Sequence, residues 1–478
     1  MKPYRRAKII CTIGPATFSE RAITRLIKAG MDVARLNFSH GDYADYKRII
    51  KTIRKQSKKL GKPVAILQDL QGPKIRTGRL KASSIKLQLG QVLTVTTKKI
   101  FGDERRISIP YKPLPHLLKK GNSILIDDGL LELKVISTSK EDIRCRVIAG
   151  GILKEHKGVN IPYVKREVPA LTKKDIEDLK FGLKNNVDHI ALSFVRSEHD
   201  IRALKRRIPK NKKVCVIAKI EKPEAMDHLD EILKEVDGIM VARGDLAVES
   251  STEAVPRLQK EIIRKCNHAL KPVITATQML ESMVEHPRPT RAEASDVANA
   301  VIDGTDALML SAETATGKYP IKAVEMMDRI IRDVEGVHTH DGSRSFMDPY
   351  HHHGNDDHES HIRATEKAAC DIAREVGAKL ICCLTERGRS ARILSQARPE
   401  QPIIAFTSEE LTLKKLSFVW GVQTHVFKGL IKTRNLFKSI RNKLIQLGLV
   451  KRDDRIVITT GLFTHSPDTA RIVKLHKI

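Results

Sequence analysis

The sequence predicts an α/β fold, a (β/α)8 barrel with a small all-β domain inserted into it and an α/β domain at the C-terminal end. Eight apolar, strand-like runs alternate with helical segments in residues 1–78 and 166–336. These runs are continuously apolar, as parallel strands covered on both faces are. A chain of 478 residues is also too long for one ordinary domain. Eight strand–helix units in series predict a closed barrel.

The expected barrel strands are short and rich in Ile, Val, Leu and Ala. They are, in order, AKIICTIG, DVARLNFSHG, VAILQDL, HIALSFV, VCVIAKIE, GIMVARGDL, PVITATQML and ALMLSAET. The clearest helices between them cover residues 19–29, 173–184 and 253–269. Thr172 stands three residues before Asp175, which predicts a capping box at the start of the second of these helices.

The residue pattern of the chain changes after the third strand. Residues 79–165 alternate Thr, Val, Ile and Leu between turns marked by glycine, which predicts a small all-β insertion. Residues 337–361 are polar and rich in histidine, as a linker or exposed loop is. Residues 362–478 return to strand–helix alternation and predict a separate, doubly wound α/β domain.

Basic residues dominate the charge, with 86 Lys and Arg against 57 Asp and Glu and a formal net charge of +29. Such a field attracts anions, which could be nucleic acid or phosphorylated metabolites. The basic residues are spread along the chain without interleaved aromatic residues, so no specific nucleic-acid role is expected. No apolar run approaches the length of a membrane-spanning helix, and the 7 cysteines lack CxxC spacing. Together these features predict a cytoplasmic protein.

Polar residues gather at the predicted strand ends, where a barrel of this type forms its active site. Lys219 and Glu221 lie two residues apart in the fifth strand and therefore on one face. Glu221 and Asp245 come from neighbouring strands, and two carboxylates suit Mg²⁺ (or Mn²⁺), with substrate and water as further ligands. Seven of the eight strands end in such residues, which are Arg35, Asn37, Ser39, His40, Asp69, Lys74, Arg76, Ser193, Lys219, Glu221, Arg243, Asp245, Thr275, Thr277, Gln278, Ser311 and Glu313.

This mixture of carboxylates and cations favours chemistry on phosphate groups. Arg35, Arg76 and Lys219 supply positive charge beside the carboxylates, as phosphoryl transfer requires. The chain has no GxxxxGK[ST] loop and no kinase-type glycine-rich loop, so a nucleotide would be bound by other means. A buried ion pair that only closes the barrel is the structural alternative for Lys219 and Glu221.

Six segments resemble motifs of the pyruvate kinase family in their order and spacing. VIAKIEKPEAM at 216–226 is similar to the active-site signature of that family. The others are ARLNFSHG at 34–41, DLQGPKIRTG at 69–78, MVARGDLAVE at 240–249, ITATQMLESM at 274–283 and PRPTRAEASDVANAVIDGTDALMLSAETATGKYP at 287–320. The resemblance covers nearly the full chain. It implies Mg²⁺-dependent phosphoryl transfer from phosphoenolpyruvate to ADP, which gives pyruvate and ATP in the last step of glycolysis. It also implies that the insertion at 79–165 is a mobile lid with a β-barrel fold, that the C-terminal domain is regulatory and that the protein is a homotetramer.

The resemblance also implies roles for residues at the strand ends. Glu221 and Asp245 would bind Mg²⁺, while Arg35 and Lys219 would hold the phosphoryl group and Lys219 would stabilise the enolate. Proton relay to the enolate would fall to a set that comprises Thr277, Ser311 and Glu313. The further substrate contacts would be Ser193, Thr277, Ala242, Arg243, Gly244 and Asp245, and the nucleotide contacts would be Asn37, Ser39, His40, Arg76 and Lys157.

One departure from the family bears on monovalent ions. Members that require K⁺ carry Asp-Thr-Lys-Gly-Pro-Glu where this chain reads DLQGPK. Leu70 offers no side-chain oxygen to K⁺, and the ammonium of Lys74 can take the ion's electrostatic place. The motif resembles that of the K⁺-independent branch, so K⁺ is predicted not to be required.

A turn in the C-terminal domain is a candidate site for a phosphate effector. Thr385, Arg387, Gly388, Arg389 and Ser390 follow a predicted strand and precede a helix. Their N–H groups, hydroxyls and guanidinium groups suit a phosphate, and the turn resembles the family's sugar-phosphate loop. A helix cap with solvated arginines is the alternative. Whether a sugar phosphate or AMP binds is left open, and the histidines of residues 337–361 lack the spacing of a metal site.

Two other classes of function stay open at this point. A Mg²⁺-dependent lyase acting on pyruvate-like enolates could use a similar barrel, but Lys219, Arg35 and the inserted domain favour phosphoryl transfer. A non-catalytic nucleic-acid-binding protein could exploit the net charge of +29 and would bind oligonucleotides in a salt-sensitive way. That second class gives no reason for Glu221 and Asp245.

Overall fold

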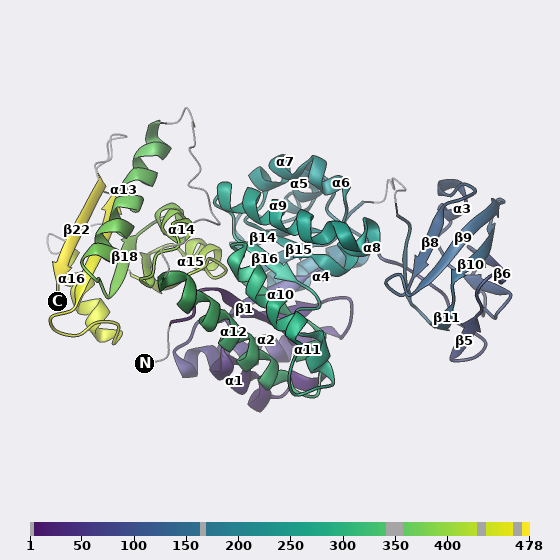
Figure 1. The fold of residues 1–478 in the computed structure, drawn as a ribbon, viewed down its shortest axis with the longest axis horizontal. Coiled ribbons are helices and arrows are strands. Elements are labelled where there is room, and N and C mark those ends of the chain that lie inside the picture. The colour runs from purple at the N-terminus through teal and green to yellow at the C-terminus, as the bar shows by residue number, and fades with distance from the viewer. Residues whose placement is uncertain (1–3, 163–168, 341–356, 428–435, 462–470) are drawn as a thin grey trace.

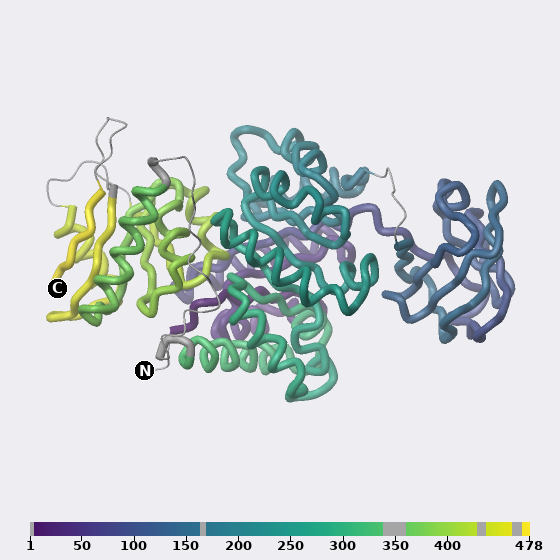
Figure 2. Tube along the Cα trace, turned by 45° about the horizontal axis from the view of Figure 1, so that its top comes forward, coloured from purple at the N-terminus to yellow at the C-terminus, as the bar shows by residue number. Residues whose placement is uncertain are grey.

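The computed structural model describes residues 4–162, 169–340, 357–427, 436–461 and 471–478. The described chain forms three bodies in a row (Figures 1 and 2), with a barrel in the middle, the inserted domain on one side and the C-terminal domain on the other. This arrangement confirms the predicted fold class. None of the described helices is long and apolar enough to cross a bilayer.

The central body is a closed barrel of eight parallel strands, each paired with its neighbours in the order β1-β2-β3-β13-β14-β15-β16-β17. The strands are almost entirely buried, because helices cover their outer face and packed side chains fill the interior. Their bounds are β1 Lys8–Thr12, β2 Val33–Asn37, β3 Ala65–Asp69, β13 His189–Leu192, β14 Cys215–Ile220, β15 Gly238–Ala242, β16 Val273–Ala276 and β17 Ala307–Leu310.

Amphipathic helices surround the barrel (Figure 1). The predicted capping box at the start of α4 is confirmed, since Thr172 and Asp175 exchange hydrogen bonds between side chains and backbone N–H groups. The long helices are α1 Glu20–Ala29, α2 Tyr43–Leu60, α4 Lys173–Lys184, α5 Glu198–Lys205, α7 Leu229–Glu235, α9 Val255–His268, α10 Arg291–Ile302 and α12 Pro320–His340. Further helices, of seven residues or fewer, lie between these and the strands, namely η1 Pro15–Thr17, α6 Glu224–Asp227, α8 Arg243–Glu249, η2 Thr252–Ala254, η3 Glu281–Val284 and α11 Ala312–Ala315.

The inserted domain has its own apolar core and is almost entirely β-structure. It forms a seven-stranded sheet in the order β4-β12-β8-β9-β10-β6-β7 and a two-stranded ribbon of β11 and β5, rather than one closed barrel. Buried and exposed residues alternate along β10, as one covered face requires. The elements are β4 Ile75–Arg76, β5 Ser84–Leu87, β6 Val92–Thr96, β7 Arg106–Ser108, α3 Leu114–Leu117, β8 Ser123–Ile126, β9 Leu131–Thr138, β10 Asp142–Ala149, β11 Gly151–Lys154 and β12 Gly158–Asn160.

The C-terminal domain is a five-stranded sheet in the order β20-β19-β18-β21-β22, packed against helices. Its last strand, β22, runs antiparallel and was not predicted from the sequence. Helices α12 and α13 extend into the segment expected to be a linker, while its histidines at 351–353 lie outside the described residues. The elements are α13 Asp357–Glu375, β18 Leu380–Leu384, α14 Arg389–Gln396, β19 Ile403–Thr407, α15 Glu410–Leu416, β20 Val422–Val426, α16 Leu436–Gln446, β21 Arg455–Gly461 and β22 Arg471–Lys477.

The C-terminal domain closes the base of the barrel, at the amino ends of the strands. Phe418, from the turn after α15, is 1% exposed and packs with the barrel-interior residues Ile10, Val33 and Leu67. Lys8 Nζ donates to the carbonyl of Val422 at 2.8 Å beside it. The carboxyl ends of the strands therefore form the other mouth of the barrel, where the predicted site residues lie.

Candidate active site

Lys219 lies at the centre of a buried ionic cluster at the barrel mouth. Its Nζ is 2.8 Å from Oε1 of Glu221 and 3.3 Å from Oδ1 of Asp69, and it donates to Oγ of Ser193 at 2.8 Å. Burial alone would lower the pKa of Lys219, but the carboxylates of Asp69 and Glu221 outweigh it and raise that pKa. The ammonium therefore stays charged at neutral pH.

Asp69 joins this cluster to Arg35. Nε and Nη2 of Arg35 each lie 2.8 Å from Oδ2 of Asp69, and Nη1 donates to Oγ1 of Thr12 at 2.9 Å. Burial would raise the pKa of Asp69, but Lys219 and Arg35 hold it below its ordinary value. The carboxylate thus holds two cations side by side. Sequence reasoning placed Asp69 at a strand end but gave it no role, because the strand pattern does not show which cations face it.

Glu221 and Asp245 are the two carboxylates predicted to bind a divalent ion. Oε2 of Glu221 accepts the N–H of Phe194 at 2.8 Å, and Oδ1 of Asp245 lies 3.4 Å from Nζ of Lys74. Burial raises the pKa of Glu221, and the charge of Asp245 raises it further against the pull of Lys219. A buried carboxylate whose ionisation a second carboxylate disfavours fits a cation that the two share.

Other oxygen donors would have to complete such a metal site. In the described part of the chain, no group of three or more His, Cys, Asp or Glu side chains is arranged to hold a metal ion. A pair of carboxylates with water and substrate oxygens is nevertheless the set that Mg²⁺ commonly takes. The residues present therefore fit Mg²⁺ better than an ion whose ligands must all come from the protein.

Thr277 follows β16 in a strained backbone conformation. Thr277 and Gln278 have φ values of 70° and 52°, in the left-handed region that side chains other than Gly disfavour. Nη2 of Arg243 donates to the Thr277 carbonyl at 2.7 Å, and the N–H of Gly244 donates to Oγ1 of Thr277 at 2.8 Å. Arg243 itself is paired with Asp296 at 2.7 Å. The Arg243 side chain therefore holds the Thr277 turn in place beside Gly244.

Ser311 and Glu313 lie just after β17. Glu313 is fully buried, and its two oxygens accept the N–H groups of Leu280 at 3.1 Å and Ser311 at 2.6 Å. Burial raises the pKa of Glu313. The Ser311 hydroxyl is buried and has no hydrogen-bond partner among the described residues. It can therefore bond a group that enters the site.

The residues predicted for the nucleotide come from two bodies. Asn37 is the last residue of β2, Ser39 and His40 lie in the turn after it, and Oδ1 of Asn37 accepts the N–H of Ser39 at 3.3 Å. Burial lowers the pKa of His40, and Arg76 and other nearby cations lower it further. Arg76 lies on β4 and Lys157 precedes β12, so both belong to the base of the inserted domain. The positive charge of Arg76 thus faces the barrel residue His40.

The predicted effector turn lies in the C-terminal domain. Gly388, with φ 78°, precedes α14 and donates its N–H to Oγ1 of Thr385 at 2.9 Å. Ser390 is buried, and its Oγ accepts from Nη1 of Arg471 on β22 at 3.2 Å. The structure thus adds Arg471 to the cations of this turn, which sequence reasoning missed because β22 was not foreseen.

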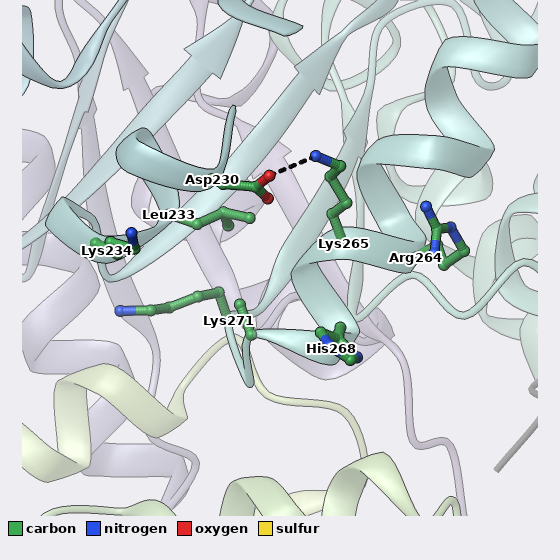
Figure 3. Close-up of a pocket in the computed structure, with 8 residues that line it drawn as sticks. Asp230, Leu233, Lys234, Arg264, Lys265, His268 and Lys271 are labelled. Atoms are coloured by element: carbon green, nitrogen blue, oxygen red, sulfur yellow. Dashed lines mark hydrogen bonds and ion pairs between the residues drawn. The ribbon is translucent and has the colours of Figure 1, made fainter. Parts of the chain in front are cut away.

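A separate cavity of about 400 Å³ lies on the outside of the barrel, between α7 and α9 (Figure 3). Lys265 pairs with Asp230 across it at 2.8 Å, and Nζ of Lys271 donates to the carbonyl of Val236 at 2.7 Å. It is lined by Asp230, Leu233, Lys234, Arg264, Lys265, His268, Ala269 and Lys271. None of the predicted active-site residues lines this cavity, so it is not the site of the reaction.

The (β/α)8 barrel and the paired cations and carboxylates at its mouth are features of a class of enzymes, the barrel enzymes that transfer phosphoryl groups. Comparison with known proteins agrees. Residues 4–324 match the model of the pyruvate kinase barrel domain, and residues 363–476 match that of the pyruvate kinase alpha/beta domain. The chain belongs to the pyruvate kinase family and is a phosphotransferase.

Individual relatives support the same assignment. The chain is 44% identical over 477 residues to the pyruvate kinases of Staphylococcus aureus strains MRSA252 and USA300, which covers 99% of this chain and 80% of each relative. The crystal structure of a pyruvate kinase from Cryptosporidium parvum matches with a TM-score of 0.87 at 37% identity, covering 99% of this chain and 96% of that one. The similarity therefore extends over all three bodies.

Proposed function

We propose that the barrel-mouth site transfers a phosphoryl group from phosphoenolpyruvate to ADP, with pyruvate and ATP as products. The observation that carries this proposal is the buried cluster in which Asp69 holds Arg35 and Lys219 together, with Glu221 2.8 Å from Lys219. Two preorganised cations beside carboxylates can stabilise the charge that spreads over a migrating phosphoryl group. A lyase has no need of such a phosphate clamp.

The site residues divide into groups that bind the phosphoryl group, the metal ion and the substrate carboxylate. Arg35 and Lys219 bind the phosphoryl oxygens, and Lys219 also stabilises the enolate oxygen that remains. Glu221 and Asp245 would hold Mg²⁺ or Mn²⁺, which when bound would neutralise phosphate charge. The substrate carboxylate lies against the backbone of residues 242–245, with the Ser193 hydroxyl nearby.

Protonation of the enolate falls to the turn after β16. Thr277 lies beside Gly244, where the substrate carboxylate is proposed to bind, and its hydroxyl can pass a proton toward the enolate carbon. Behind it stand the buried Glu313 and the hydroxyl of Ser311, for which the described part of the chain offers no hydrogen-bond partner, as the rest of the relay.

The nucleotide would bind between the barrel and the inserted domain. Asn37, Ser39 and His40 face it from the barrel, while Arg76 and Lys157 contribute from the inserted domain. Closing that domain over the site would exclude water, so that ADP rather than water accepts the phosphoryl group.

Turnover of the Lys219→Met variant tests the site. Loss of one transition-state donor should lower kcat by ~10²–10³-fold while phosphoenolpyruvate binding largely persists. A coupled assay that detects pyruvate from phosphoenolpyruvate and ADP measures it. Lys234→Met, on the outer cavity, is the control and should keep wild-type turnover. Near-normal turnover by Lys219→Met would remove the role of this lysine.

Independence from K⁺ is proposed from the same site. The ammonium of Lys74 lies 3.4 Å from Asp245, and the Leu70 side chain is buried without a polar group to offer an ion. We expect full activity in buffer free of K⁺. Negligible activity that rises many-fold with added KCl would reject this proposal.

We also propose an effector site and an oligomeric state for the protein. A sugar phosphate or AMP would bind the turn formed by residues 385–390, in a cytoplasmic homotetramer. Activation curves with both ligand types, for wild type and Arg389→Ala, test the turn, and sedimentation velocity tests the tetramer. An absence of any phosphate effect on wild type and variant would reject the effector site.

A further inference from the structure

A buried polar triad links the inserted domain to the barrel. Oε1 of Glu249 accepts from Nδ2 of Asn160 at 2.8 Å, and Oε2 of Glu249 lies 2.8 Å from Nζ of Lys222. The side chains of Lys222 and Glu249 are 8% and 3% exposed, and Asn160 is 4% exposed. All three residues belong to different segments, and Asn160 alone comes from the inserted domain, at the end of β12.

Both barrel members of the triad adjoin a proposed metal carboxylate. Lys222 directly follows Glu221, and Glu249 lies one helical turn after Asp245 on α8. In Figure 1, α8 lies at the edge of the barrel that faces the inserted domain. One carboxylate, Glu249, therefore connects the two segments that carry Glu221 and Asp245.

The other connection into the inserted domain reaches the same place. Nζ of Lys74 lies 3.4 Å from Asp245, and Lys74 directly precedes β4. Strand β4 pairs with β12 in antiparallel register, with Ile75 opposite Val159. The base of the inserted domain thus contacts Asp245 through Lys74 and Glu249 through Asn160. The pairing of β4 with β12 holds Lys74 and Asn160 close together.

We propose that Asn160, Glu249 and Lys222 form an anchor that positions Glu221 and Asp245 for the metal ion and ties them to the inserted domain. The triad residues are positioning residues, since they act through the two carboxylates. A carboxylate this deeply buried is stable only while its partners remain, so Glu249 holds Lys222 and Asn160 at set distances. Orienting partners of metal ligands commonly change metal affinity by ~10–100-fold when they are lost.

Binding of Mn²⁺ to the free, full-length protein tests the anchor without turnover. We expect Asn160→Ala to raise the Mn²⁺ dissociation constant by ~10-fold or more, measured by electron paramagnetic resonance. Asn160→Asp should raise it further, because it sets a second carboxylate against Glu249. Asn122→Ala is the matched control, since the Asn122 side chain accepts the N–H of the nearby Lys119 within the inserted domain and should leave Mn²⁺ binding unchanged when it is removed.

A purely structural triad would give a different result. Asn160→Ala would then lower the melting temperature and leave the Mn²⁺ dissociation constant at the wild-type value, which would overturn the proposal. If Asn160→Ala fails to fold, Glu249→Gln, which keeps the shape and an acceptor for Asn160, must weaken Mn²⁺ binding in its place. The inference rests on the metal role of Glu221 and Asp245. Failure of wild type to bind Mn²⁺ would reject that role, whereas equal binding by wild type and variant rejects only the anchor.

Discussion

Single side chains at the barrel mouth have their charges set by their neighbours. Asp69 is 1% exposed and stays ionised because Arg35 and Lys219 both contact it. Each cation is in turn held in one orientation by that carboxylate. The sequence could predict that these residues end strands, since strand ends are visible as breaks in apolar runs. It could not show that Asp69 lies between two cations, because that depends on how neighbouring strands are staggered.

Asp69→Asn should therefore impair catalysis without removing either cation. The amide keeps the shape but loses the charge that orients both side chains, and we expect kcat to fall ~10–100-fold, as when other orienting partners are lost. Steady-state kinetics measures this, with Asp103→Asn on the inserted domain as the control. An unchanged kcat would mean that Arg35 and Lys219 keep their positions without Asp69.

His189 at the base of the barrel is held neutral. The Ser417 hydroxyl donates to the Lys414 carbonyl at 2.8 Å, so Nε2–H of His189 must donate to Oγ of Ser417 at 2.9 Å. Nδ1 is buried and has no hydrogen-bond partner among the described residues. Burial lowers the pKa of His189 to about 4, against the opposing charges of Asp188 and Asp237, and Lys414 lowers it further.

This histidine predicts a loss of stability in acid. Between about pH 6.5 and pH 4 the unfolded chain binds the proton and the folded chain does not, so the free energy of unfolding falls as the pH drops. The contribution is roughly 1.4 kcal/mol for each unit of pKa difference. Denaturant unfolding should show a shallower pH dependence for His189→Gln than for wild type. His116→Gln, at an exposed position, should keep the wild-type slope, and equal slopes for all three proteins would contradict this account.

At the scale of elements, four aspartates each join the amino ends of two neighbouring barrel strands. Each stands directly before β2, β13, β15 or β17 and accepts an N–H from the strand before it in the barrel order. The pairs are Asp32 with Ile9 at 2.9 Å, Asp188 with Ile66 at 2.8 Å, Asp237 with Val216 at 3.0 Å and Asp306 with Val273 at 3.0 Å. The barrel is therefore joined at its base in four strand pairs.

These aspartates show which features of the helices and strands could be predicted from the sequence. Apolar runs and caps predicted the eight strands and the helix at 173–184, because both depend on local patterns. The recurrence of Asp before every second strand is also visible in the sequence, although its meaning is clear only once the strands are paired. Strand β22 was missed because it is antiparallel and carries a half-exposed pattern with Lys and His.

Asp306 offers the sharpest test of the repeat, because its second oxygen accepts the N–H of Trp420 at 3.0 Å. Asp306→Ala leaves two buried N–H groups without partners and should lower the free energy of unfolding by about 2–6 kcal/mol. Denaturant titration measures the loss. Asp230→Ala removes an ion pair with Lys265 in which the Asp230 side chain is 62% exposed, and it should cost about 0–1 kcal/mol. Equal effects of the two substitutions would show that the aspartate repeat adds little.

At the scale of the whole molecule, the barrel depends on the C-terminal domain for its base. Phe418 belongs to the C-terminal domain, but its side chain packs among the residues of the barrel interior. The centroids of the Phe418 and His189 rings lie 4.4 Å apart in an edge-to-face arrangement. Nothing in the local sequence around Phe418 indicates this contact, since the ring and the strands are far apart in the chain. Phe418 and Trp420 of the C-terminal domain thus belong to the core of the barrel, although that domain also has apolar clusters of its own. Because of this shared core at the base, the two bodies should unfold together.

Phe418→Ala should weaken both bodies at once. Loss of a buried phenylalanine costs about 3–5 kcal/mol, because the cavity it leaves collapses only in part. Calorimetry should show the melting of barrel and C-terminal domain shifted down together, while the inserted domain, which has a separate core, is unaffected. Phe101→Ala, at a position 58% exposed on the inserted domain, should leave the shared transition in place. Separate transitions for the barrel and the C-terminal domain in wild type would show that the shared core does not couple them.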